Sequence, residues 1–118
     1  MKWTTDAIKK LADENPNGFT VNVETGNKLT HGHAVALTHS IKLEDAALLA
    51  NNWIIDAEYG LTFGYATHTL GGWKSPSGEY MIDLGLIIED EGEALDLAKQ
   101  YRQYSIYNLD GNSEIVVD

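Results

Sequence analysis

The side chains best suited to chemistry in this chain are carboxylates, which crowd into one short stretch towards the C-terminus. The five acids are Glu89, Asp90, Glu91, Glu93 and Asp96. Carboxylates on successive turns of a helix can match the spacing of nucleic-acid phosphates and guide a protein to a basic partner. We therefore predict that these acids form a partner-binding face, with Tyr101 and Tyr104 as its aromatic anchors.

Two histidines in a strand-like segment raise the possibility of metal binding. His31 and His33 have the i, i+2 spacing that places two imidazoles on one face of a strand. His39 or His68 could complete such a site in the folded protein. However, Gly32 weakens the strand assignment, no carboxylate stands at ligand spacing beside the pair, and the chain has no cysteine. We therefore predict no metal site and no cofactor.

Acid–base catalysis has one candidate acid, Asp83, which falls within the longest predicted strand. His68 could accompany it in a cleft between this strand and residues 59–70. The chain contains no nucleophile elbow, phosphate-binding glycine loop or zinc-protease helix. A polar side chain on the less buried face of a strand is the simpler interpretation of Asp83. We predict no enzymatic activity; the alternative is a small hydrolase or transferase that uses Asp83 and His68.

The charge balance limits the classes of partner. The 118 residues have a formal net charge of −10, and the excess of acids is uneven. Residues 1–43 carry five lysines against four acids, whereas residues 44–118 carry three basic residues against fourteen acids. This balance disfavours direct binding to nucleic acid, because phosphates are neutralised by a basic surface. The two interpretations left open are a solvated surface that aids solubility and a partner with a basic groove.

Length and hydropathy predict one domain over residues 1–118. No apolar run approaches the length needed to span a bilayer, and the first residues lack the apolar core of a signal peptide. We therefore expect a cytoplasmic protein that does not bind a membrane.

The clearest supersecondary unit of the chain positions the predicted acids. Residues 80–88 alternate so that one face is wholly apolar, which predicts a strand inside a sheet. Asp90 suits the N-cap of a helix over residues 90–103, with Glu93 in the capping-box position. Two shorter strands are predicted to follow, at residues 105–109 and 114–117.

The first part of the chain adds two helices and a hairpin. Apolar residues at helical spacing predict helices over residues 5–14 and 43–58. Alternation predicts a strand over 19–23 and a return strand over 35–38, and the glycine-interrupted residues 59–70 favour an ordered loop or short strand. The predicted fold is α+β: one small domain with a four- or five-stranded, mostly antiparallel sheet and about three helices packed mainly on one face.

A series of short motifs also runs through roughly the last 50 residues. Its members are Gly71-Gly72-Trp73, Gly78-Glu79-Tyr80, Asp83, Glu93-Ala94-Leu95, Leu97-Ala98, Gln103, Ser105-Ile106-Tyr107 and Leu109. The series resembles a group of small proteins of phages, prophages and other mobile elements, with a tryptophan turn, a strand with an aspartate, an acidic helix and a Gln-x-[Ala/Ser]-Ile-[Tyr/Phe]-Asp-Leu ending. Two positions depart from that pattern. Asn108 stands where an aspartate is usual, and Tyr101-Arg102 stands where asparagine commonly precedes the glutamine.

Small acidic phage proteins are similar in size and charge to inhibitors of host defence, including anti-CRISPR and anti-restriction proteins. By this analogy we expect a DNA mimic in the host-cell cytoplasm. It would occupy the basic groove of a host protein, such as a CRISPR or restriction nuclease. A virion-associated structural module is a further alternative.

Overall fold

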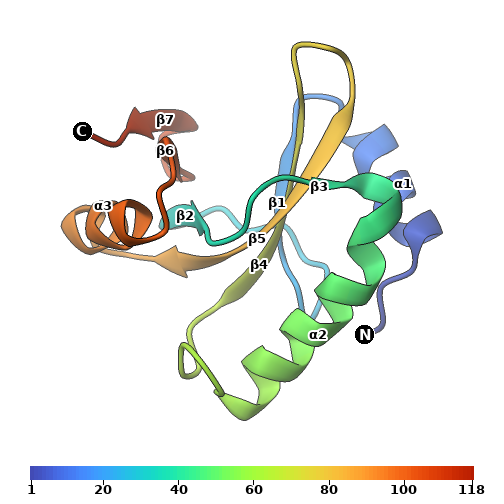
Figure 1. The fold of residues 1–118 in the computed structure, drawn as a ribbon, viewed down its shortest axis with the longest axis horizontal. Coiled ribbons are helices and arrows are strands. Elements are labelled where there is room, and N and C mark those ends of the chain that lie inside the picture. The colour runs from blue at the N-terminus through green and yellow to red at the C-terminus, as the bar shows by residue number, and fades with distance from the viewer.

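Three α-helices and seven strands are arranged around the strand predicted at residues 80–88. In chain order the elements are α1 (Thr5–Glu14), β1 (Phe19–Asn22), β2 (His33–Ala36), β3 (Ile41–Lys42), the 3-10 helix η1 (Leu43–Asp45), α2 (Ala46–Tyr59), β4 (His68–Lys74), β5 (Tyr80–Ile88), α3 (Glu91–Gln100), β6 (Ser105–Asn108) and β7 (Ser113–Val116). The computed structural model describes residues 1–118. All strand pairs are antiparallel in the order β1-β4-β5-β2-β6-β7, and β3 also pairs with β5 (Figure 1).

Local sequence signals set the helix ends. The Thr4 hydroxyl accepts a hydrogen bond from the Ala7 amide at 3.1 Å and caps α1. The Asp90 carboxylate accepts one from the Glu93 amide at 2.9 Å and caps α3. Helix α2 follows η1 without a side-chain cap and ends at Gly60, whose φ of 59° suits glycine. The acids in the first turn of α3 therefore belong to a helix with a fixed start.

The helices differ from prediction only at their ends. Helix α2 begins at Ala46, after the single turn of η1, and α3 ends at Gln100 rather than at residue 103. Arg102 follows with a left-handed φ of 54°, which is incompatible with further α-helix. None of the three helices combines the length and the apolar composition needed to cross a membrane.

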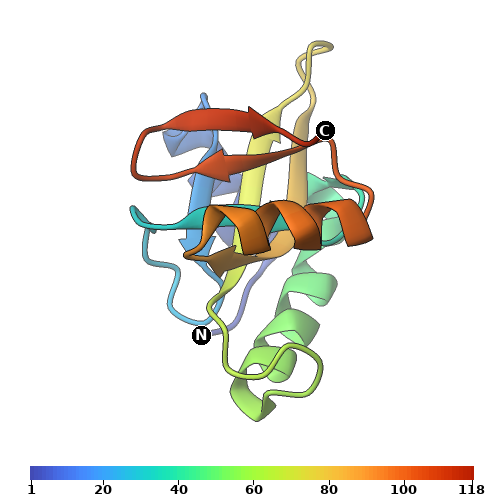
Figure 2. The ribbon, with the colours of Figure 1, turned by 90° about the vertical axis from the view of Figure 1, so that its left-hand side faces the viewer.

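Alternation along β5 gives the sheet a helix-covered face and an open face. Ile82, Leu84 and Leu86 are buried on the helix-covered side. Asp83 points the other way, opposite Gly71 of β4 in the strand register. Helices α1 and α2 pack on the first side. We call the second side, on which Asp83 lies, the open face. Figure 2 views the molecule from the side of α3 and the β6–β7 hairpin, and it shows the hairpin running crosswise to β1 and β4.

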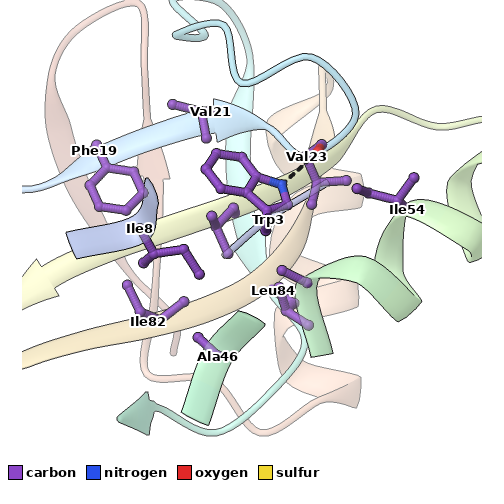
Figure 3. Close-up of a cluster of buried hydrophobic side chains, with 11 residues drawn as sticks. Trp3, Ile8, Phe19, Val21, Val23, Ala46, Ile54, Ile82 and Leu84 are labelled. Carbon is purple, nitrogen blue, oxygen red and sulfur yellow. Dashed lines mark hydrogen bonds between the residues drawn. The ribbon is translucent and has the colours of Figure 1, made fainter. Parts of the chain in front are cut away.

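Two apolar cores hold the helices on the sheet. The larger core packs α1 and α2 against β1, β4 and β5 and includes Trp3 (Figure 3). The Trp3 indole N–H donates to the Val23 carbonyl at 2.8 Å, so its polar atom is satisfied within the core. The smaller core packs α3 on β2 and β6 and consists of Val35, Ala94, Ala98 and Ile106. Because two alanines form the inner side of α3, the helix lies close to the sheet.

The α+β class and the three helices are confirmed, but the sheet has seven strands rather than four or five. Strand β4 is hidden in the sequence by Gly71 and Gly72, because adjacent glycines are unusual inside a strand. Both leave room for a neighbouring side chain. A Cβ on Gly71 would lie 2.6 Å from a carboxylate oxygen of Asp83, and one on Gly72 would lie 2.2 Å from the Phe19 ring.

The predicted hairpin of residues 19–40 is wrong. Strand β1 pairs with β4, whereas β2 pairs with β5 and β6, so β1 and β2 are separated by two strands. The pairing with β4 places Val21 opposite Leu70, and both side chains are buried in the larger core. Alternation indicates which side of a strand is buried, but it does not identify the neighbouring strand.

We predict that Gly85→Ala lowers the free energy of unfolding by about 2 kcal/mol or more. A Cβ at this position would lie 2.1 Å from the Val35 carbonyl oxygen, in the backbone of the neighbouring strand β2. The control is Gly92→Ala in the exposed first turn of α3, where higher helix propensity gains up to about 1 kcal/mol. Urea unfolding measures both variants. Wild-type stability of the Gly85→Ala protein would contradict the close approach of β2 and β5.

Candidate functional site

The five predicted acids lie together at the start of α3, and all five are exposed. We call this surface, formed by residues 89, 90, 91, 93 and 96, the acidic face. The opposite side of the helix is anchored to the sheet through Ala94 and Ala98, which are fully buried. Acids at a helix N-terminus also face the positive end of the helix dipole. The acidic face is therefore held on a rigid and electrostatically compatible support.

Positive charge from within the molecule barely compensates the acidic face. The chain forms three side-chain ion pairs, and each of them uses a histidine rather than a lysine or arginine. Within the acidic face only Glu91 has such a partner, with its carboxylate 3.8 Å from Nε2 of His33. The other four acids have no cationic partner. Their negative potential is therefore available to attract a basic surface.

A shallow depression of about 360 Å³ adjoins the acidic face. Its apolar lining includes Phe63, Leu86, Ile88 and Leu97, and its polar lining includes Glu93 and Asp96. Apolar surface beside carboxylates suits an amphipathic cation, because the stems of lysine and arginine side chains are apolar while their heads are charged. The depression can therefore accept a lysine or arginine side chain from another protein.

The two predicted aromatic anchors occupy different surroundings. Tyr101 is half-buried, and its ring centroid lies 6.0 Å from that of Phe63, beside the depression. Tyr104 is 72% exposed and lines a groove on the open face instead. The structure thus places Tyr101 near the acidic face and separates Tyr104 from the depression.

The groove on the open face is the larger cavity, with a volume of about 740 Å³. It is lined by Trp73 of β4, Asp83 of β5 and Tyr107 of β6, and we call it the open-face groove. The Asp83 carboxylate lies over Gly71 and has no ion-pair partner. Burial raises the pKa of Asp83 to about 6. The groove therefore has a recessed acid in its floor.

His68 lies on the helix-covered side of the sheet, away from Asp83. In the strand register it pairs with Leu86, which belongs to the buried set of β5 residues. Asp83 and Leu86 are three residues apart on β5, so their side chains point to opposite faces of the sheet. Because His68 lies on the Leu86 side, the predicted cleft shared by Asp83 and His68 does not form. The structure does not bring the two residues of the predicted hydrolase or transferase together.

Instead, His68 forms a buried pair with Asp56 of α2. Its Nε2 lies 2.7 Å from the Asp56 carboxylate and its Nδ1 lies 2.7 Å from the Ala66 carbonyl. Both ring nitrogens of His68 therefore face an oxygen atom within hydrogen-bond distance. Burial raises the pKa of Asp56, but hydrogen bonds from Thr62 and His68 outweigh it and hold this pKa below its usual value.

Asp56 was not among the predicted site residues, although the helix pattern contains a signal for it. Trp53 and Asp56 are three residues apart and share one side of α2. The Trp53 ring lies 4.3 Å from the His68 ring between centroids, while Asp56 holds the imidazole edge. A carboxylate that lies on the apolar side of a helix, as Asp56 does, indicates a buried hydrogen-bonding partner.

The other histidines do not assemble a metal site. His31 Nδ1 lies 2.7 Å from Asp110, whereas His33 contacts the Ile88 carbonyl and Glu91. No three residues among histidines and acids come together in a geometry that could hold a metal ion. The hydrogen bond from His31, and a second from the Gly32 amide, hold the pKa of Asp110 below its usual value.

We predict that Asp83→Asn stabilises the protein by up to about 3 kcal/mol at pH 7.5 and leaves stability nearly unchanged at pH 4. Below pH 4 the carboxyl is protonated in both the folded and the unfolded chain. Between about pH 4 and 6 the unfolded chain releases its proton first, so the stability of the wild-type protein falls as the pH rises.

Urea unfolding at the two pH values measures this effect. The matched control is Glu79→Gln at the exposed 75–79 turn, which should change stability by less than about 0.5 kcal/mol at both pH values. An Asp83→Asn protein that is less stable than wild type at pH 7.5 would show that the carboxylate is satisfied within the fold.

We predict that Asp56→Asn lowers the free energy of unfolding at pH 7 by about 2–4 kcal/mol, because it removes the buried carboxylate that His68 and Thr62 contact at 2.7 Å. The pKa of Asp56 is lowered on folding, so its contribution exists above about pH 4 and disappears as the pH falls through the folded-state pKa. Thermal and urea unfolding from pH 7 to pH 2 test both parts. The exposed change Asp13→Asn is the control, and equal losses for both variants would refute the pairing.

Comparison with protein-family models, curated proteins and solved structures finds no match for this chain.

Proposed function

We propose that the protein is a non-catalytic binding protein whose acidic face docks on a basic surface of another protein. One observation carries the proposal: five exposed carboxylates lie within eight residues, without a lysine or arginine partner, beside an apolar depression. An acidic surface that serves only solubility does not need an apolar depression beside it. The combination of unpaired charge and apolar area is typical of a protein interface.

The depression gives the proposed interface a centre. A lysine or arginine from the partner would lay its stem on Phe63 and Leu97 and direct its charged head to Glu93 and Asp96. Burying an aliphatic stem adds apolar contact to the charge pair, and such centrally placed contacts carry most of the binding energy in protein interfaces. The Tyr101 ring lies beside Phe63, with 6.0 Å between the ring centroids.

The chemistry of the partner follows from the chemistry of the face. Nucleic-acid phosphates are bound by surfaces rich in lysine and arginine, and carboxylates on a helix can compete for the same cations. We therefore propose that the acidic face acts as a DNA mimic that blocks nucleic-acid binding. By analogy with inhibitors of host defence, which are similar in size and charge, we propose a host defence nuclease as the partner and the host cytoplasm as the location.

We predict that replacing Glu89, Glu91 and Glu93 together by glutamine weakens binding to the partner by more than tenfold and flattens its salt dependence. The three acids support the start of α3 by about 0.3–1 kcal/mol each, so the variant should remain folded. The partner is captured from bacterial lysate at low salt, and the affinity of the purified partner is then measured with each variant, with and without DNA.

The matched control is the triple change Glu14→Gln, Glu44→Gln and Glu79→Gln. These three acids are also exposed and lie on α1, η1 and the 75–79 turn, so the control has the same net charge as the test variant. The proposal requires wild-type affinity for the control and competition by DNA. Equal affinity of both triple variants, or capture of no nucleic-acid-binding protein, would refute it.

A further inference from the structure

We propose that the open-face groove is a second binding site, specific for a small organic cation whose ammonium or guanidinium group pairs with the Asp83 carboxylate. This site is independent of the acidic face. The groove is lined from the open side of the sheet, whereas the depression is lined by residues of α3, the helix-covered face and the 60–67 loop. Neither the proposed partner nor the acids of α3 are needed for it.

The floor of the groove supplies an unpaired charge. Asp83 has neither an ion-pair partner nor a hydrogen-bonded donor among the side chains, and burial alone accounts for its raised pKa. Asp83 is half-buried and lines the groove. A recessed carboxylate that the fold leaves without a donor is costly, and a bound cation would remove that cost.

Backbone without side chains opens the way to this carboxylate. Asp83 lies opposite Gly71, and a Cβ there would lie 2.6 Å from Oδ1 and 3.3 Å from Oδ2. Glycine at this position therefore makes the space in which the carboxylate lies. The neighbouring strand contributes Thr20, the register partner of Gly71, which lines the same groove.

The walls of the groove favour an organic cation. Trp73 and Tyr107 line it from different strands and remain 41% and 40% exposed. Aromatic ring faces attract ammonium and guanidinium groups, and this attraction is stronger where water is partly excluded. A hard divalent cation would need several oxygen ligands, but no three acids or histidines come together here or elsewhere in the chain.

The volume of the groove agrees with a small ligand. About 740 Å³ falls within the range of small-molecule sites. Lys28, His39 and Glu114 also line the groove, and the Glu114 carboxylate already accepts a hydrogen bond from Ser105 at 2.9 Å. Asp83 is therefore the acid in the groove that has no side-chain donor.

The test is an NMR titration of the full-length protein with agmatine and with putrescine, at millimolar concentrations and pH 7.5. We expect saturable shifts of the Gly71, Gly72 and Asp83 amides and of the Trp73 indole N–H. Asp83→Asn should weaken the binding at least tenfold, and Trp73→Leu should weaken it by a smaller factor. Unchanged amide spectra away from the groove would show that both variants are folded.

The triple variant at Glu89, Glu91 and Glu93 serves as a control that is independent of the proposed protein partner. Wild-type titration curves for this variant would assign the binding to the groove rather than to general attraction of cations by an acidic protein. Equal affinity of wild type and Asp83→Asn would overturn the proposal. So would shifts confined to α3, or the absence of saturable shifts with both amines.

Discussion

The close packing of β4 against β5 is the constraint on which the rest of the structure depends. Gly71 and Gly72 leave no side chains in the middle of β4, so Asp83 occupies the space on one side and Phe19 occupies it on the other. The Phe19 ring also stacks on Tyr80 at 6.0 Å between centroids, above Gly72. A bulkier residue at either glycine would displace the core or close the open-face groove. One strand pair thus determines both the packing and the larger cavity.

Sequence reasoning identified the features encoded by local patterns. The alternation of residues 80–88 predicts the central strand with its bounds, and Asp90 with Glu93 predicts the start of α3. The position of Asp83 on the less buried side of the strand is also confirmed. These features depend on neighbours within a few residues of one another, where periodicity and capping are informative.

Features that depend on distant contacts were missed for a physical reason. In β4, Gly71 and Gly72 leave space that Asp83 of β5 and Phe19 of β1 fill. In the sequence alone, two adjacent glycines indicate a loop rather than a strand. The partner of His68 is Asp56, on a different element, and the face of the sheet that His68 occupies follows from register. Strand register and strand order depend on which side chains are buried across the whole sheet. A short stretch of sequence does not contain this information.

The acidic face and Asp83 differ in their effect on the stability of the fold. The acids of α3 are exposed and supported by the helix dipole, so they are retained at little expense to stability. Asp83 is recessed and has a raised pKa, so its charged form opposes folding at neutral pH. An exposed cluster suits long-range attraction of a large basic surface, whereas a single recessed acid suits one small cation.

The central claim is that the acidic face contacts a basic protein. Hydrogen exchange of this chain, compared in the free state and in complex with the captured partner, tests it most directly. The account predicts new protection over residues 89–97 and in the 60–67 loop beside Phe63, with α1 and the 75–79 turn unchanged. Protection confined to α1, to the 75–79 turn or to the exposed side of α2 would contradict it.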